Sequence, residues 1–226
     1  MDYLFEKFKE RVSPLLEPIG FKLKNRRFYI RITEERIYQS IELTRRPHTS
    51  MKYMALPLFL GKGIYLSSGG NWMGKAWYNF EKNEATHDEN AAEMALFVKD
   101  VLIPFFEKTK TMSGAYQAEI EGSSMTRNYI IGLYHVRNGE RQTILDEIDR
   151  VIALDEEGAK RNIACYRELN YMSEDKIQDY IKRVQKKRED GLQRKIFFAE
   201  SSIENILKYF KANEEEVIRL AKWKFE

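Results

Sequence analysis

The sequence predicts an α+β fold, in which an N-terminal antiparallel sheet flanked by helices is followed by an all-α helical bundle. Apolar residues alternate with period two in several runs before residue 111, as in strands that bury one face. From about residue 112 they recur with a period near 3.6, as in helices. A polar stretch with a glycine, residues 109–114, separates the two patterns. We therefore expect an α+β domain over residues 1–111 and a helical domain over residues 112–226.

The first domain is expected to open with a helix and to continue with four strands. Apolar residues at helical spacing precede Gly20, which should end the helix; they are Leu4, Phe5, Phe8, Val12, Leu15 and Leu16. Alternating runs follow within residues 21–24, 28–33, 37–43 and 56–60. Because Asn25-Arg26 and Glu34-Glu35 are short enough for hairpin turns, neighbouring strands should be antiparallel.

A second helix is expected after the sheet. Thr86 and Glu89 have the spacing of a capping box, and the apolar stripe that follows extends to Phe105. Pro104 should kink or end this helix, because proline has no backbone N–H to donate.

Five apolar stripes indicate the helices of the second domain. They lie within residues 144–152, 163–169, 177–184, 203–210 and 217–223. Breaks are expected at Asn170–Ser173, with Ser173 as an N-cap, and again at Asn213. Short connections favour antiparallel neighbours, so the stripes predict a small bundle.

The composition excludes several classes of protein. The 226 residues are 43% hydrophobic and 32% charged with a net charge of +3, which is typical of a globular chain. No apolar run approaches the roughly 18 residues of a membrane helix, and the acidic start lacks the layout of a secretory signal. The single cysteine, Cys165, excludes an intramolecular disulfide. We expect a cytoplasmic protein that makes no membrane contact.

No motif carries a recognisable catalytic chemistry. Residues 69–75 fit G-x-x-x-x-G-K, but a phosphate-binding loop needs Ser or Thr at the next position, where Ala76 stands. We interpret this stretch as a glycine-rich turn. None of the three histidines has the spacing of a metal ligand, and Cys165 is expected to be a buried structural thiol. The sequence predicts no cofactor, no metal and no catalytic residue.

The strand region is basic, with nine Lys and Arg against three acidic residues within residues 22–52. Lys22, Tyr29, Arg31 and Tyr38 could share the sheet face opposite the core. A basic face with aromatic rings can hold single-stranded nucleic acid through phosphates and stacked bases. The alternative is an ordinary solvated face, or one covered by the helical half. The residues proposed for nucleic-acid contact are Lys24, Arg26, Arg27 and Arg31.

A second candidate surface is aromatic. Trp72, Trp77 and Tyr78 lie in a dense aromatic stretch beside the glycine-rich turn. They could form core under that turn, or they could line a recognition groove. Our hypothesis is that Trp72 is partly exposed and anchors a protein interface.

The first half also resembles a known family. Residues 15–24, LLEPIGFKLK, predict a helix that ends in a proline-glycine turn, and a strand then opens on Phe28-Tyr29. The pattern continues through the strand around Gln39 to the tryptophan region at Trp77. Over about residues 2–110 the chain resembles the bacterial "domain of unknown function 4304" family, which implies a small α+β domain and assigns no activity. The second half resembles no family in this way.

The leading functional prediction is a non-catalytic protein-binding module of a bacterial cytoplasm, immunity-like or regulatory in kind. The alternative is a nucleic-acid-associated protein that uses the basic strands. A second alternative is an enzyme whose site is assembled from dispersed residues, because such sites leave little trace in a sequence.

Overall fold

The computed structural model describes residues 3–25, 28–44, 50–60, 71–72, 84–121 and 135–221. The chain divides into two compact units, of which the first contains Met1–Glu121 and Asn213–Glu226, and the second contains Gly122–Ala212. The predicted boundary at residue 112 therefore falls inside the first unit, and the last helix contributes to both units.

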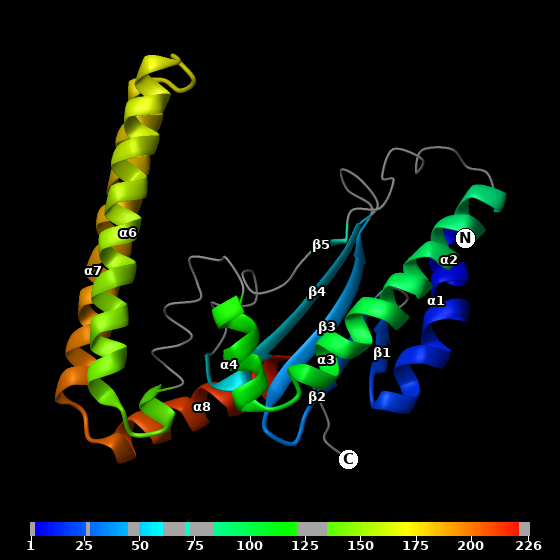
Figure 1. Ribbon diagram of the computed structural model, residues 1–226. Helices are drawn as coiled ribbons and strands as arrows, with labels where there is room; N and C mark the ends of the chain where they lie inside the picture. Colours follow the sequence, from blue (N-terminus) through cyan, green and yellow to red (C-terminus); the bar gives the residue numbers. More distant parts are fainter. Residues whose placement is uncertain are drawn as a thin grey trace. The chain divides into compact units, whose positions relative to one another are not determined.

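An antiparallel sheet in the strand order β1-β2-β3-β4-β5 forms the centre of the first unit (Figure 1). Its strands are β1 (Lys22–Asn25), β2 (Phe28–Ile32), β3 (Ile37–Thr44), β4 (Ser50–Pro57) and β5 (Asn71–Trp72). The predicted antiparallel pairing is confirmed for every neighbouring pair. Glu34-Glu35 forms the predicted turn between β2 and β3, where Arg36 takes a positive φ of 63°.

Helices surround this sheet in the first unit. They are α1 (Tyr3–Leu16), η1 (Glu17–Ile19), η2 (Leu58–Leu60), α2 (Glu84–Phe97), η5 (Val98–Leu102), α3 (Ile103–Lys108) and α4 (Met112–Glu121). The predicted start at Thr86 is wrong, since α2 begins at Glu84 and already contains Thr86 and Glu89. Pro104 interrupts the helix as predicted: a π-helical turn, η5, precedes it, and the proline occupies the first turn of α3, where no N–H is needed.

One face of the sheet packs on α1 and α2, which lie side by side (Figure 1). Apolar side chains from α1, the helix pair α2–α3 and this sheet face form one continuous core. The predicted apolar stripe of α1 is confirmed, and Gly20 follows the turn after it with φ of 90°, a conformation that favours glycine. The fully buried members include Leu4, Phe8, Val12, Leu16, Tyr29, Ile41, Leu43 and Phe106.

Part of the opposite sheet face is covered as well. Ile30, Tyr38 and Leu58 pack against Val217 and Ile218 of α8 (Ile203–Ala221). Because both faces are covered, the alternation along β2 does not separate a core face from a solvent face.

The interpretation that Lys22, Tyr29, Arg31 and Tyr38 share one outer face is wrong. Tyr29 lies in the core under α1, and Arg31 shares its side of β2. Tyr38 is paired with Ile32 and Lys22 with Ile30, which places both on the other face.

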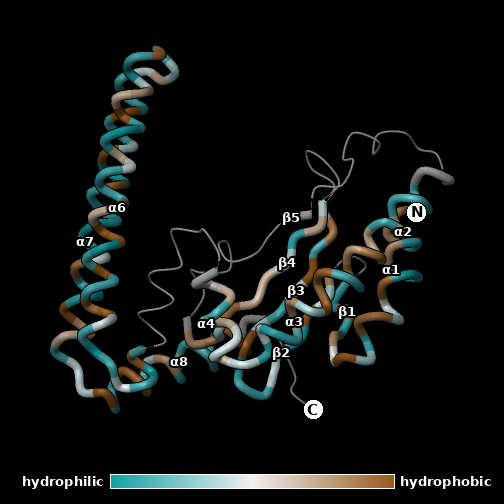
Figure 2. Tube along the Cα trace, in the orientation of Figure 1, coloured by the Kyte–Doolittle hydropathy of each residue, from teal (hydrophilic) through white to brown (hydrophobic). Residues whose placement is uncertain are grey.

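The second unit is built on a helical hairpin of α6 (Arg141–Glu168) and α7 (Glu174–Glu200), which run side by side (Figure 1). Hydrophilic and hydrophobic residues recur along both helices (Figure 2). The predicted break at Asn170–Ser173 is confirmed, with Asn170 at a φ of 52° and Ser173 at the N-cap of α7.

Two predictions for the helical half are wrong. Helix α8 continues through Asn213, where a break was predicted. The Asn213 side-chain amide instead donates a hydrogen bond to the Phe59 carbonyl at 3.1 Å. Cys165 is exposed, because a helix in a two-helix hairpin covers only one of its faces. Beyond Thr111, the described residues form helices and turns and no strand, as predicted.

Among the described helices, none combines the length and the apolar character that crossing a membrane requires.

Candidate functional site

The predicted binding residues fall into three groups. Lys24 is exposed on the edge strand β1, and Arg31 lies on the face of β2 that packs on α1 and α2. The backbone of Trp72 belongs to β5, while its side chain lies outside the described residues, as do Arg26, Arg27, Trp77 and Tyr78 entirely. The structure therefore brings no two of the predicted side chains together among those it describes.

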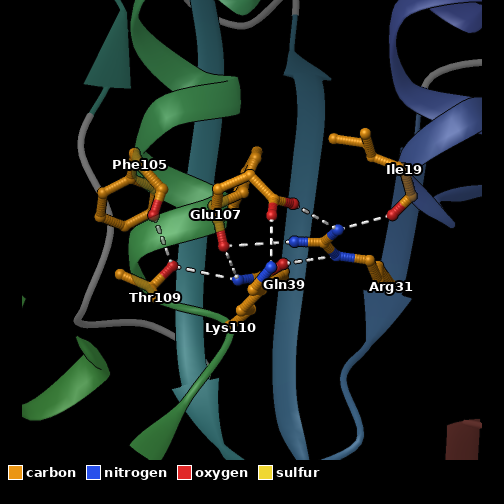
Figure 3. Close-up of polar contacts among 8 residues, drawn as sticks. Ile19, Arg31, Gln39, Phe105, Glu107, Thr109 and Lys110 are labelled. Carbon is orange, nitrogen blue, oxygen red and sulfur yellow. Dashed lines mark hydrogen bonds and ion pairs between the residues drawn. The ribbon is translucent and has the colours of Figure 1, made fainter. Parts of the chain in front are cut away.

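Arg31 is the centre of a polar network between the sheet and α3 (Figure 3). Its Nε donates to Gln39 Oε1 at 2.7 Å, and its Nη1 donates to the Ile19 carbonyl at 2.5 Å and to Glu107 Oε1 at 3.0 Å. Its Nη2 donates to the Phe106 carbonyl at 3.2 Å. Only 11% of the Arg31 side chain is exposed.

The rest of the network is equally well satisfied. The Gln39 amide is buried and donates to the Phe106 carbonyl at 2.8 Å and to Thr109 Oγ1 at 3.0 Å. Hydrogen bonds from Lys110 and from Arg31 hold the pKa of Glu107 below its usual value. Buried polar groups with complete sets of partners fix one arrangement of the elements that carry them. This network joins α3 to β2 and β3. All three nitrogens of the Arg31 guanidinium donate hydrogen bonds within the fold.

An exposed aromatic cluster lies at the end of the second unit's hairpin, where α6 turns into α7. We call it the hairpin tip, and it consists of Tyr166, Leu169, Tyr171 and Tyr180. Tyr171 is 74% exposed and Leu169 is 67% exposed, the two highest values among the exposed large hydrophobic residues of the described chain. Tyr171 stacks on Tyr166 with ring centroids 6.1 Å apart, and Tyr166 meets Tyr180 edge-on at 5.8 Å.

Local hydrogen bonds give the hairpin tip a defined shape. The Tyr171 N–H donates to the Tyr166 carbonyl at 3.0 Å, which closes the turn over the end of α6. Arg167 holds Glu174 across the turn through two hydrogen bonds, at 2.6 and 3.2 Å. Asn162 donates to the Tyr180 hydroxyl at 3.2 Å. These hydrogen bonds fix the shape of the turn, and stacking on Tyr166 orients the Tyr171 ring.

The hairpin tip contains aromatic and aliphatic groups, and the described residues include no group of three His, Cys, Asp or Glu side chains able to hold a metal ion. The turn is predicted from the sequence, but this exposed surface is not. The available signal was the pair of large apolar residues, Leu169 and Tyr171, that flank the helix-breaking Asn170.

Comparison with known proteins adds no relative: no family model, no curated protein and no solved structure matches this chain. The resemblance of residues 2–110 to the "domain of unknown function 4304" family stays a prediction.

Proposed function

We propose that this chain is a non-catalytic protein-binding module that docks through the hairpin tip. The observation that carries the proposal is the exposure of Tyr171 and Leu169 on a turn whose geometry is fixed by hydrogen bonds. Tyrosine is enriched among the residues that dominate interface energies, and burial of such a ring in a partner's pocket supplies a large apolar area. The partner is a protein with an apolar pocket that accepts the two side chains.

The finer features of the proposal extend the same argument. A reducing, cytoplasmic setting suits an exposed cysteine on α6, Cys165, near the hairpin tip. An immunity-like or regulatory role suits a module without catalytic chemistry. Trp72, Trp77 and Tyr78 stay predicted anchors of a second contact in the first unit.

Nucleic-acid binding through the basic strands is the weaker candidate. Among its four proposed residues, Arg31 already donates hydrogen bonds within the fold, to Glu107 and to two backbone carbonyls. A phosphate would have to displace these partners, at the cost of unsatisfied buried acceptors.

Site-specific photocrosslinking tests the proposal. A benzophenone amino acid replaces Tyr171 in the full chain, and the matched control places it at Gln193, an exposed position on the same helix pair. The two positions are separated by about 30 Å of helix, at 1.5 Å per residue. We expect a discrete protein adduct from position 171 in cells of the source organism, none from position 193, and a severalfold lower yield when Leu169→Ala is added.

Three results would contradict the proposal: equal adducts from both positions, no adduct from position 171, or an adduct that nuclease removes. The last of these would favour nucleic acid as the partner. Because Tyr171 is mostly exposed, its replacement should change the free energy of unfolding by no more than about 0.5 kcal/mol. A folded variant thus makes each result interpretable.

A further inference from the structure

A pocket of about 270 Å³ opens on the face of the sheet opposite α1 and α2, within the first unit. Its lining residues come from three neighbouring strands: Phe28 from β2; Tyr38, Ser40 and Glu42 from β3; Lys52 and Met54 from β4. The volume is near the lower end of the range for small-molecule sites, which suits a ligand of amino-acid size.

The strand register explains why the sheet is hollow at this point. Phe28, Glu42 and Lys52 form one row across the three strands, and Ser40 lies in the next row between Ile30 and Met54. Side chains two residues apart on a strand share a face, so the small Ser40 is surrounded by larger neighbours. Ser40 is only 2% exposed and forms the floor of the pocket.

The inner part of the pocket is lined by uncharged residues. Burial raises the pKa of Tyr38 to about 12. The nearby Glu42 carboxylate also raises this pKa, whereas a side-chain hydrogen bond with Ser40 lowers it. The phenol thus stays protonated at any physiological pH. Phe28 and Met54 complete apolar walls that favour an apolar group of a ligand.

The rim, by contrast, carries two opposite charges. Glu42 and Lys52 are directly paired across β3 and β4 on the pocket's face. Among the described residues, no ion pair or hydrogen bond joins these two side chains to each other. A carboxylate and an ammonium group therefore stand side by side above an apolar hollow.

We propose that this pocket binds a small zwitterion with an apolar side chain, the chemical form of a free apolar α-amino acid. The ligand's ammonium group pairs with Glu42, its carboxylate pairs with Lys52, and its side chain enters the hollow between Phe28, Tyr38 and Met54. Two charge-assisted contacts of opposite sign distinguish a zwitterion from a simple amine or a simple acid.

Isothermal titration calorimetry with L-leucine tests the proposal on the full chain. A ligand of this size should bind with a Kd on the order of 1 mM. We expect saturable binding at one site, and about tenfold weaker binding to Glu42→Gln and to Lys52→Gln. The matched control is Lys22→Gln, an exposed lysine on the same sheet face outside the pocket, which should bind like the unchanged chain. N-acetyl-leucine and leucine methyl ester, each lacking one charge, should both bind about tenfold more weakly.

Several outcomes would overturn the proposal. No saturation at L-leucine concentrations of about 20 mM would remove it, since that is well above the expected Kd. Undiminished binding of leucine methyl ester would identify an amine site, and undiminished binding of N-acetyl-leucine would identify a carboxylate site. Lys52→Arg keeps the charge and should keep the binding, which separates loss of contact from loss of fold.

Discussion

The two units of this protein use different means to hold their helices. In the first unit, large side chains such as Phe8, Tyr29 and Phe106 are fully buried between a sheet and helices distant in sequence. In the hairpin of the second unit, each helix buries one narrow stripe, and charged side chains meet across the seam. The cross-seam ion pairs join Lys195 to Asp149, Lys187 to Asp155 and Arg188 to Glu156.

The two kinds of packing have different structural consequences. A layered core tolerates a buried polar network and shapes a pocket, because its elements are fixed from several sides. A two-helix hairpin has little interior, so large side chains such as Leu169 and Tyr171 stay at its surface. Exposed ion pairs of this kind each contribute about 0–1 kcal/mol, so the hairpin depends on its apolar stripe.

The largest expected effect comes from truncating the core of the first unit. Phe8 has no exposed surface and meets Tyr29 edge-on at 6.1 Å. Phe8→Ala should lower the free energy of unfolding by about 3–5 kcal/mol, through lost burial and the cavity that remains. Urea denaturation of the full chain measures this change. A loss below about 1 kcal/mol would contradict the core assignment.

The matched truncation in the hairpin is Ile177→Ala, since Ile177 is 1% exposed on α7. We expect a cost of about 2–3 kcal/mol, with faster amide hydrogen exchange in α6 and α7 and unchanged exchange in β2 and β3. Equal acceleration of exchange in the sheet would show that the two units unfold together, which would contradict separate stabilisation of the two units.

The next effect in size concerns the buried network. Arg31→Met removes the donor for Gln39, Glu107 and two backbone carbonyls while keeping much of the side-chain volume. The loss of these bonds, above all the one to the buried Gln39 Oε1, should cost about 2–4 kcal/mol of stability. The control is Lys22→Met on β1, whose exposed side chain should change stability by about 0.5 kcal/mol or less. Similar denaturation midpoints for both variants would show that Arg31 is not structural.

Arg31 also shows how far the sequence predicts this fold. Period and turn signals predict β1, β2, β3, the turn at Glu34-Glu35 and the antiparallel order, because these depend on residues near each other in the chain. The fourth strand, predicted within residues 56–60, is misplaced: β4 spans Ser50–Pro57, and Leu58–Leu60 form η2. The same signals do not predict which sheet face is covered. A charged residue usually marks a solvent face. Arg31 can be buried because hydrogen bonds to Gln39 and Glu107, which are distant in sequence, offset the free-energy cost of removing its charge from water.

The candidate sites follow the same division. The turn of the hairpin tip is local, so the break at Asn170–Ser173 is predictable from its residues. The exposure of Tyr171 depends on the absence of a covering helix among the described residues, which no local pattern encodes. The pocket over Ser40 depends on the register of three strands, and period-two patterns fix faces but not which residues lie opposite one another.

The smallest expected effect compares one carboxylate from each unit. Hydrogen bonds from Lys110 and Arg31 lower the pKa of Glu107, and hydrogen bonds from Arg167 and Gln178 lower the pKa of Glu174. A lowered pKa means that the folded state binds fewer protons than the unfolded chain near pH 4.5. Each carboxylate therefore contributes stability above that pH, and the contribution is lost as the pH falls through the lowered pKa.

Carbon-13 NMR of the side-chain carboxyl groups separates the two sites. Lys110→Met should raise the pKa of Glu107 alone, and Arg167→Met should raise that of Glu174 alone. In about 1 M salt, the pKa of Glu174 should return most of the way to its ordinary value, because its partners are exposed and screened. The pKa of Glu107 should stay lower, because Arg31 is only 11% exposed and salt screens a buried partner less. An equal response to salt at both positions would mean that the polar network is as open to solvent as the hairpin surface.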